Sequence, residues 1–147
     1  VGRRRVDGHQ LGAECVHVAR RRPQGDVPWA VAAVRIAKAG SEIDAAWALL
    51  INNIREAQDH VARGEQIPLS LRLRIRRDQV LGTQRAIDAI DALFEASGGR
   101  ALAEGTYLQR AWRDAHAGRV HAANDPERAL KVFGDLEFGH KIDPGMY

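Results

Sequence analysis

Cysteine is almost absent from this sequence of 147 residues, which contains only Cys15. No disulfide can form within the chain, so we expect a cytoplasmic protein, because thiols stay reduced there. Long apolar runs are absent as well. A membrane-spanning helix needs about 18 or more apolar residues in succession, so we expect no membrane partner. The chain begins with Val1 instead of methionine, which suggests a fragment, a processed form or a misplaced start.

Aromatic residues are also scarce, at 5% of the chain. Lysine and arginine number 22 and acidic residues 19, which gives a net charge of only +3. The basic residues gather at 3–5, 20–22 and 72–77, without aromatic side chains between them. Nucleic-acid binding favours a basic face interleaved with stacking aromatics. We therefore expect solvated helix faces at these clusters and no nucleic-acid partner.

What is abundant is helical periodicity. From Trp29 to Arg63 apolar residues recur at alternating steps of four and three, which predicts a long helix packed side by side with another. Gly64 is expected to end it. Gly40, in its middle, indicates a kink or a close crossing of helices. The predicted seam is Trp29, Ala33, Ile36, Gly40, Ile43, Trp47, Leu50, Ile54, Ala57 and Val61.

A second helix is expected from Pro68 to about Ala96. Its first part, LSLRLRIRR, alternates apolar and basic residues, which by itself favours a strand. We prefer a helix, because helical steps continue through residue 94 and the sequence offers no partner strand. The glycines of the segment 97–100 are expected to cap its C-terminal end.

Two shorter helices follow. The third is predicted from Thr106, as N-cap, to Ala123, with Trp112 in the core. The fourth begins at Asp125-Pro126, where a capping carboxylate precedes proline at the first turn. The fold class is therefore all-α, an up-and-down helical bundle over residues 29–147. Residues 1–28 are a poorly defined segment, which we interpret as the remnant of a first bundle helix. Apolar stripes are expected at Tyr107, Leu108, Ala111, Ala115 and Ala122 of the third helix and at Ala129, Leu130, Phe133 and Leu136 of the fourth.

His121 is the candidate for chemistry. His116 precedes it by five residues, whereas metal-binding pairs on a helix prefer four, so we predict no metal site. From the residues alone, a buried and hydrogen-bonded His121 is the preferred interpretation over a catalytic one. If the third helix extends to Ala123, His121 shares one face with Arg110, Arg113, Asp114, Ala117 and Gly118.

The run LQRAWRDAHAGRVHAANDPERA, preceded by FEASGGRAL, resembles a known family. It is similar to the C-terminal helical domain of the oxygenase components of two-component flavin-dependent monooxygenases, which share the acyl-CoA dehydrogenase fold. The resemblance extends upstream through VRIAKAGSEIDAAWALL and IPLSLRLRIRRD and covers Val34 to the C-terminus. The N-terminal helical domain and the β-barrel domain of that family are absent from this sequence.

The resemblance implies reduced flavin, FMN or FAD, delivered by a separate reductase. It also implies hydroxylation of a phenolic ring, here of a secosteroid in bacterial steroid breakdown, by a homotetramer. His121 corresponds to the acid/base residue, and Gly99, Arg100, His121 and Ala122 to residues that border the flavin. Arg21 corresponds to a residue that reaches the flavin phosphate of a neighbouring subunit; a basic linker is the alternative there.

Two alternatives stay open. An acyl-CoA dehydrogenase of the same fold would need a glutamate base, and no glutamate occupies the face that carries His121. A degenerate bundle that serves only helix-mediated association is the second. We expect the isolated chain to show no turnover.

Overall fold

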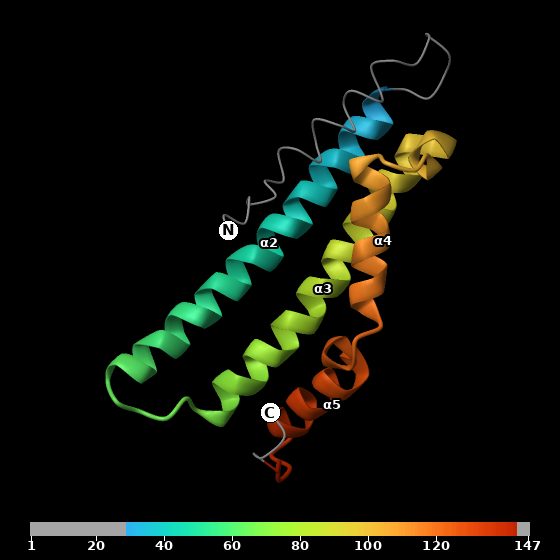
Figure 1. The fold of residues 1–147 in the computed structure, drawn as a ribbon. Coiled ribbons are helices and arrows are strands. Elements are labelled where there is room, and N and C mark those ends of the chain that lie inside the picture. Colours follow the sequence, from blue (N-terminus) through green and yellow to red (C-terminus); the bar gives the residue numbers. More distant parts are fainter. Residues whose placement is uncertain (1–28, 144–147) are drawn as a thin grey trace.

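The computed structural model describes residues 29–143, which form two long helices and two shorter ones (Figure 1). The helices α2 (Trp29–Ala62) and α3 (Leu69–Ser97) run antiparallel as a hairpin. Helix α4 (Tyr107–Arg119) lies along the second half of α3, and α5 (Pro126–Glu137) packs near the first half. Two short 3-10 turns, η1 (Gly98–Leu102) and η2 (Ala122–Asn124), flank α4. The prediction of an all-α, up-and-down bundle is confirmed for these residues.

The helix boundaries follow local chemistry. Gly64 has a φ of 71° just beyond the end of α2, as its predicted role requires. The Thr106 hydroxyl accepts a hydrogen bond from the Gln109 amide at the start of α4. The Asp125 carboxylate accepts one from the Glu127 amide at 3.0 Å, ahead of Pro126. The segment 69–77, which alternates like a strand, is helical throughout.

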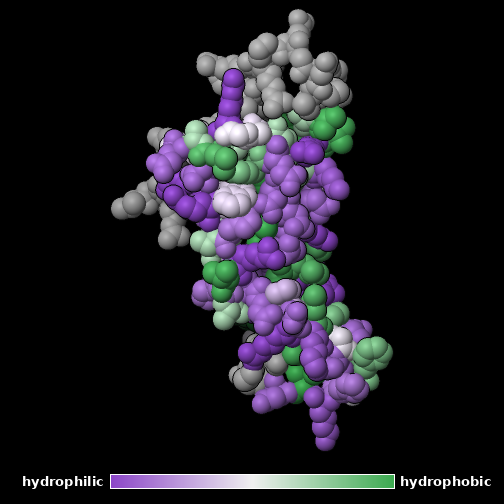
Figure 2. Space-filling model, turned by 90° about the vertical axis from the view of Figure 1, so that its right-hand side faces the viewer, coloured by the Kyte–Doolittle hydropathy of each residue, from purple (hydrophilic) through white to green (hydrophobic). Residues whose placement is uncertain are grey.

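The core lies between α2, α3 and α4. Its buried side chains include Ile90 and Leu93 of α3 and Leu108 of α4. Trp112 packs against them, as predicted, although it is only half-buried. The face on the α4 side is mostly hydrophilic, as Figure 2 shows. Among residues 29–143 no helix is long and apolar enough to cross a membrane.

The predicted seam of α2 is wrong in detail. Its side chains at Trp47, Ile54 and Val61 are 57%, 40% and 63% exposed. The strip that faces α3 instead carries small and polar residues spaced by seven, which are Ala39, Ala46 and Asn53. The large side chains lie to one side of this strip.

The physical reason is a close approach of the two helices. A Cβ built on Gly82 of α3 would lie 3.5 Å from the Ala46 Cβ, so only small residues fit between the backbones there. At Gly40, where a kink or a close crossing was predicted, such a Cβ would meet no atom of another described element within 4 Å. The crossing is therefore at Gly82, on the partner helix.

The inward stripe of α5 also differs from the prediction. The helix buries Ala129 and Val132, whereas Leu130 is 38% exposed. Phe133 lies under the guanidinium of Arg77, with the Arg77 Cζ 4.4 Å from the ring centroid. The buried stripe of α5 therefore differs from the predicted one, because the Phe133 ring packs against the Arg77 guanidinium of α3 as well as against apolar groups.

Candidate functional site

The segment around His121 is not helical, which corrects the sequence prediction. Helix α4 ends at Arg119, and His121 has extended backbone angles, φ −69° and ψ 133°. His121 therefore does not share a helical face with Arg110, Arg113, Asp114, Ala117 and Gly118. The reason is local: the Asn124 side chain donates to the Gly118 carbonyl at 2.7 Å and satisfies the end of α4 in place of a further turn.

His121 is exposed and not buried, and it caps η2. The Ala123 amide donates to His121 Nδ1 at 3.0 Å. Ala122, the neighbouring predicted site residue, is exposed as well. The two residues lie together in a turn that connects α4 to α5, so the interpretation of His121 as a buried histidine is wrong.

A cavity of about 190 Å³ opens beside this turn. One wall comes from α3, where the buried side chains of Val80 and Ile87 supply an apolar lining. The opposite wall is the turn itself and includes His121 and Ala122. Cavities for small molecules typically reach about 300–1,000 Å³. This one is large enough for only part of such a ligand, and its lining includes the residue His121 as well as the apolar side chains of α3.

Gly99 and Arg100 are far from this cavity. They lie exposed in η1, at the other end of α4 from His121 (Figure 1). The 13 residues of α4 separate the two ends by about 20 Å. Gly98, with a φ of 62°, is the predicted C-cap glycine of α3. Arg21, the remaining predicted site residue, lies outside the described residues.

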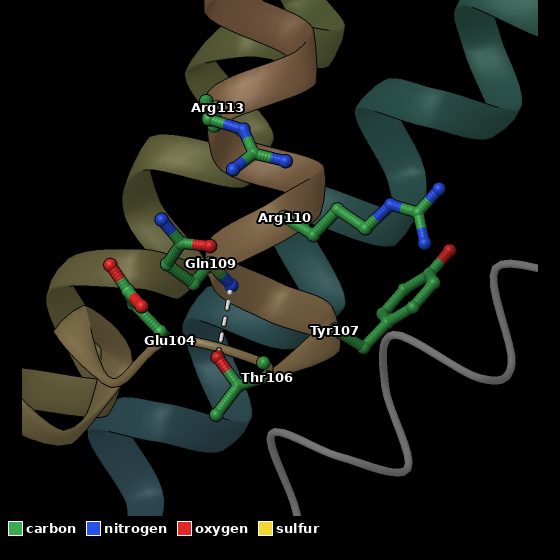
Figure 3. Close-up of a pocket in the computed structure, with 7 residues that line it drawn as sticks. Glu104, Thr106, Tyr107, Gln109, Arg110 and Arg113 are labelled. Atoms are coloured by element: carbon green, nitrogen blue, oxygen red, sulfur yellow. Dashed lines mark hydrogen bonds between the residues drawn. The ribbon is translucent and has the colours of Figure 1, made fainter.

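A second, more polar cavity of about 540 Å³ adjoins Gly105 at the η1 end of α4 (Figure 3). Tyr107 and Arg110 point to one side of the helix and Glu104 and Gln109 to the other, while the Arg113 side chain extends across the helix between them. The sequence predicted a surface pair of Arg110 and Asp114, and these side chains lie 3.7 Å apart. It did not predict the cavity, since Glu104 and Gly105 come from the loop before the helix.

One polar cluster was missed by the sequence analysis. Trp112 Nε1 of α4 donates to Asp91 Oδ1 of α3 at 2.7 Å. His116 Nε2 lies 3.4 Å from the same oxygen, and the His116 ring packs on the indole. On the other side, Phe94 stacks on Trp112 with ring centroids 4.9 Å apart. This cluster fixes α4 on α3 one turn before the segment that bears His121.

The cluster could not have been predicted from sequence spacing, because Asp91 and Trp112 are on different helices.

No group of three or more histidine, cysteine or acidic side chains in residues 29–143 is arranged to hold a metal ion.

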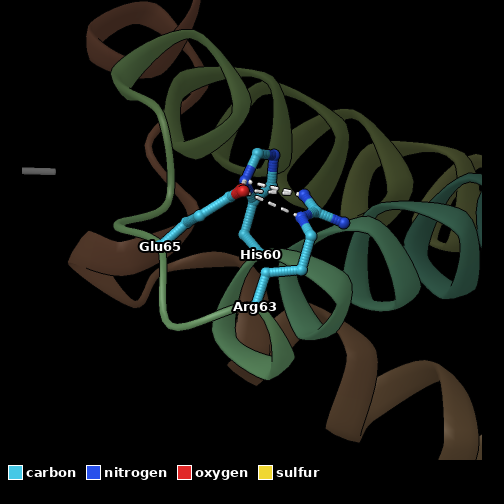
Figure 4. Close-up of polar contacts among 3 residues, drawn as sticks. All are labelled: His60, Arg63 and Glu65. Atoms are coloured by element: carbon cyan, nitrogen blue, oxygen red, sulfur yellow. Dashed lines mark hydrogen bonds and ion pairs between the residues drawn. The ribbon is translucent and has the colours of Figure 1, made fainter.

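The marked pKa shifts lie away from the His121 cavity. At the turn after α2, hydrogen bonds from Arg63 and then from His60 lower the pKa of Glu65 to about 2 (Figure 4). Within the second half of α5, a hydrogen bond from Lys131 lowers the pKa of Asp135. Both are exposed ion pairs, a kind that contributes little to stability because solvent and salt screen it.

Comparison with known proteins defines the class. Residues 11–126 match the family described as acyl-CoA dehydrogenase, C-terminal domain. Because this match covers most of the chain and agrees with the helical fold, the chain belongs to that family.

Within the family the chain is similar to particular flavin enzymes. It is 60% identical over 115 residues to the flavin-dependent monooxygenase, oxygenase subunit HsaA, of Rhodococcus jostii RHA1, and 59% identical over 114 residues to HsaA of Mycobacterium tuberculosis. The first alignment covers 78% of this chain and 30% of the relative. The chain therefore spans about a third of the length of these relatives.

Solved structures agree with these relatives. The crystal structure of 3-HSA hydroxylase from Rhodococcus sp. RHA1 matches with a TM-score of 0.82 and 52% identity, over 92% of this chain and 36% of that one. XiaF from Streptomyces sp., in complex with FADH2 and glycerol, matches with a TM-score of 0.79 and 27% identity, over 95% and 36% of the two chains.

Proposed function

We propose that this chain is the C-terminal domain of the oxygenase component of a two-component flavin-dependent monooxygenase. Its substrate is a phenolic ring, and a secosteroid of steroid degradation is the substrate we favour. The observation that carries the proposal is the exposed His121 at a cavity with one apolar wall, in a chain 60% identical to an HsaA oxygenase subunit. Reduced flavin, FMN or FAD, is the cofactor, and a separate reductase supplies it.

His121 is the acid/base residue in this proposal. A phenol has a pKa of about 10, and its ring is attacked faster as the phenolate. An imidazole titrates nearest to neutral pH of all side chains, and acid/base assistance is typically worth about 100- to 10,000-fold in rate. Bound flavin supplies the activated oxygen. The residues of this chain contact the ring and hold the proton at His121.

The residues proposed to contact the flavin fall into two groups that lie at opposite ends of α4. His121 and Ala122 line a cavity that suits one edge of a flat ring. Gly99 and Arg100 lie about 20 Å away, the length of α4, which exceeds a three-ring flavin head. We infer that Gly99 and Arg100 contact another part of the cofactor or the flavin of another subunit. Arg21 is proposed to contact a flavin phosphate.

The enzyme is proposed to be a homotetramer. The support is the side of α2 that carries Trp47, Ile54 and Val61, which the described residues leave partly exposed. A second copy of the chain would bury these side chains. In size-exclusion chromatography with light scattering, Trp47→Glu should lower the molar mass relative to wild type, while the exposed Asn52→Asp should not.

Two other functions make different predictions. An acyl-CoA dehydrogenase would reduce its flavin with an acyl thioester, in the absence of any reductase. A module that serves only association would bind no flavin, and the same exposed face of α2 supports it. Measuring the flavin content and the substrate that the protein accepts distinguishes both alternatives from the proposed hydroxylase.

The first experiment is the mass of the native product in its own cell extract, together with its bound flavin. A product longer than this chain that binds flavin supports the hydroxylase, whereas a flavin-free product of this size supports the association module. In the flavin-binding product, His121→Ala should lower phenol hydroxylation by about 100-fold or more. Unchanged hydroxylation would remove His121 from the acid/base role.

A further inference from the structure

The side chain of Asn124 bridges the turn after α4, alongside backbone hydrogen bonds within the turn. Its Nδ2 donates to the Gly118 carbonyl at 2.7 Å, and its backbone amide donates to the His121 carbonyl at 2.7 Å. The Asn124 Oδ1 lies 3.5 Å from the Thr83 hydroxyl of α3. That hydroxyl has a shorter partner, the Gln79 carbonyl at 3.0 Å. The Gly118 carbonyl also accepts from the His121 amide at 3.3 Å, so the Asn124 bond is the shorter of two hydrogen bonds that tie the turn to this carbonyl of α4.

The closed turn decides which ring nitrogen of His121 is available. It places the Ala123 amide 3.0 Å from His121 Nδ1, with the amide as donor. A nitrogen that accepts a hydrogen bond in the ring plane carries no proton. In the neutral imidazole the proton is then on Nε2. The described residues give Nε2 no hydrogen-bond partner, and the ring lines the 190 Å³ cavity.

We propose that Asn124 is a positioning residue that holds His121 in the tautomer with the proton on Nε2, so that His121 meets a bound anionic oxygen as a hydrogen-bond donor. The identity of that oxygen, a phenolate, rests on the function proposed above. A charged acceptor makes such a bond shorter and stronger than a neutral one. In this tautomer His121 acts as the acid of its acid/base role, because Nε2 carries the proton and donates it in a hydrogen bond to the phenolate oxygen.

The chain offers matched variants for a test. Asn124→Asp keeps the size of the side chain but replaces the Nδ2 donor by an oxygen that repels the Gly118 carbonyl. Asn124→Ala removes the donor without adding charge. Asn52 is exposed on α2, remote from the turn in the fold, so Asn52→Asp makes the same chemical change as a control.

The measurement is nuclear magnetic resonance of the ¹⁵N-labelled 147-residue chain at alkaline pH. A ¹⁵N–¹⁵N coupling across the bond joins the Ala123 amide to His121 Nδ1, and the ring ¹⁵N shifts show which nitrogen carries the proton. His121→Gln assigns the signals. We expect the coupling and a protonated Nε2 in the wild type and in Asn52→Asp. In Asn124→Asp and Asn124→Ala the coupling should disappear, and the two ring shifts should move toward each other.

Two results would overturn the proposal. One is a wild-type chain without the coupling. The other is a coupling that survives in either Asn124 variant, and the amide spectrum of each variant shows whether it is folded. If Asn124→Asp does not fold, Asn124→Ala decides the matter, and loss of the fold in both variants would assign Asn124 to stability and reject the specific role. The readout needs neither flavin nor substrate, so it stands or fails separately from the proposed hydroxylation.

Discussion

Asn53 of α2 donates a 2.7 Å hydrogen bond to Asp78 of α3, and both side chains are buried. Arg74 Nε donates to Asn53 Oδ1 at 3.1 Å, and Arg77 Nε donates to Asp78 Oδ1 at 2.7 Å. Arg74 also pairs with Glu56. This network fixes the register of the hairpin, because a shift of either helix would leave a buried amide or carboxylate without a partner.

Replacement of Asp78 by alanine should therefore cost more than an average substitution. The variant leaves the buried Asn53 amide without its acceptor and Arg77 without its carboxylate. We expect a loss of about 3 kcal/mol in the free energy of unfolding, measured by urea denaturation. Asp88→Ala, on the exposed side of the same helix, should change it by less than about 0.5 kcal/mol. Equal losses in the two variants would show that the network does not set the register.

Two glycines should respond in opposite directions to alanine. Gly82 lies within α3, and a Cβ there would meet the Ala46 Cβ at 3.5 Å, an ordinary van der Waals contact. Gly82→Ala should stabilise the chain by about 1 kcal/mol, the helix-propensity difference. Gly64 has a φ of 71°, so Gly64→Ala should destabilise it by about 1 kcal/mol.

Thermal and urea unfolding of both variants measure these changes. A Gly82→Ala variant less stable than wild type would mean that α2 and α3 lie closer in solution than the 3.5 Å contact allows.

The turn after α2 should carry an acid-sensitive contact. Arg63 and His60 lower the pKa of Glu65 from 4.5 to about 2. Because the folded protein binds this proton more weakly than the unfolded chain, the contribution of Glu65 to stability is complete above about pH 4.5 and declines as the pH falls toward 2. A carboxyl titration by nuclear magnetic resonance should give a midpoint near 2 for Glu65.

Arg63→Met removes the largest cause of this shift and should move the midpoint toward 4.5. Arg55→Met removes an exposed arginine elsewhere on α2 and should leave the midpoint in place. An unchanged midpoint in Arg63→Met would contradict the assigned cause.

The sequence by itself determined the helices and most of their ends. Asp125-Pro126 starts α5, and Gly64 follows the end of α2. Both could be predicted because capping and positive-φ preferences act over a few residues only. The amphipathic periods that indicate helices are local in the same sense. The run HAGRVHAAND also pointed to the oxygenase family before any geometry was known.

Only the tertiary structure decided which helix faces pack together and where His121 lies. The long α2 carries a stripe of large apolar residues beside a strip of small ones, and only the close approach at Gly82 selects the second. Asp91 and Trp112 lie on different helices, so their hydrogen bond could not be predicted from their spacing in the sequence. His121 does not lie on the predicted helical face. The Asn124 side chain, six residues beyond Gly118, donates to the Gly118 carbonyl, which would have accepted a backbone amide if the helix had continued. Each of these outcomes depends on contacts between groups distant along the chain or on competition for one hydrogen-bond acceptor, which local periodicity does not encode.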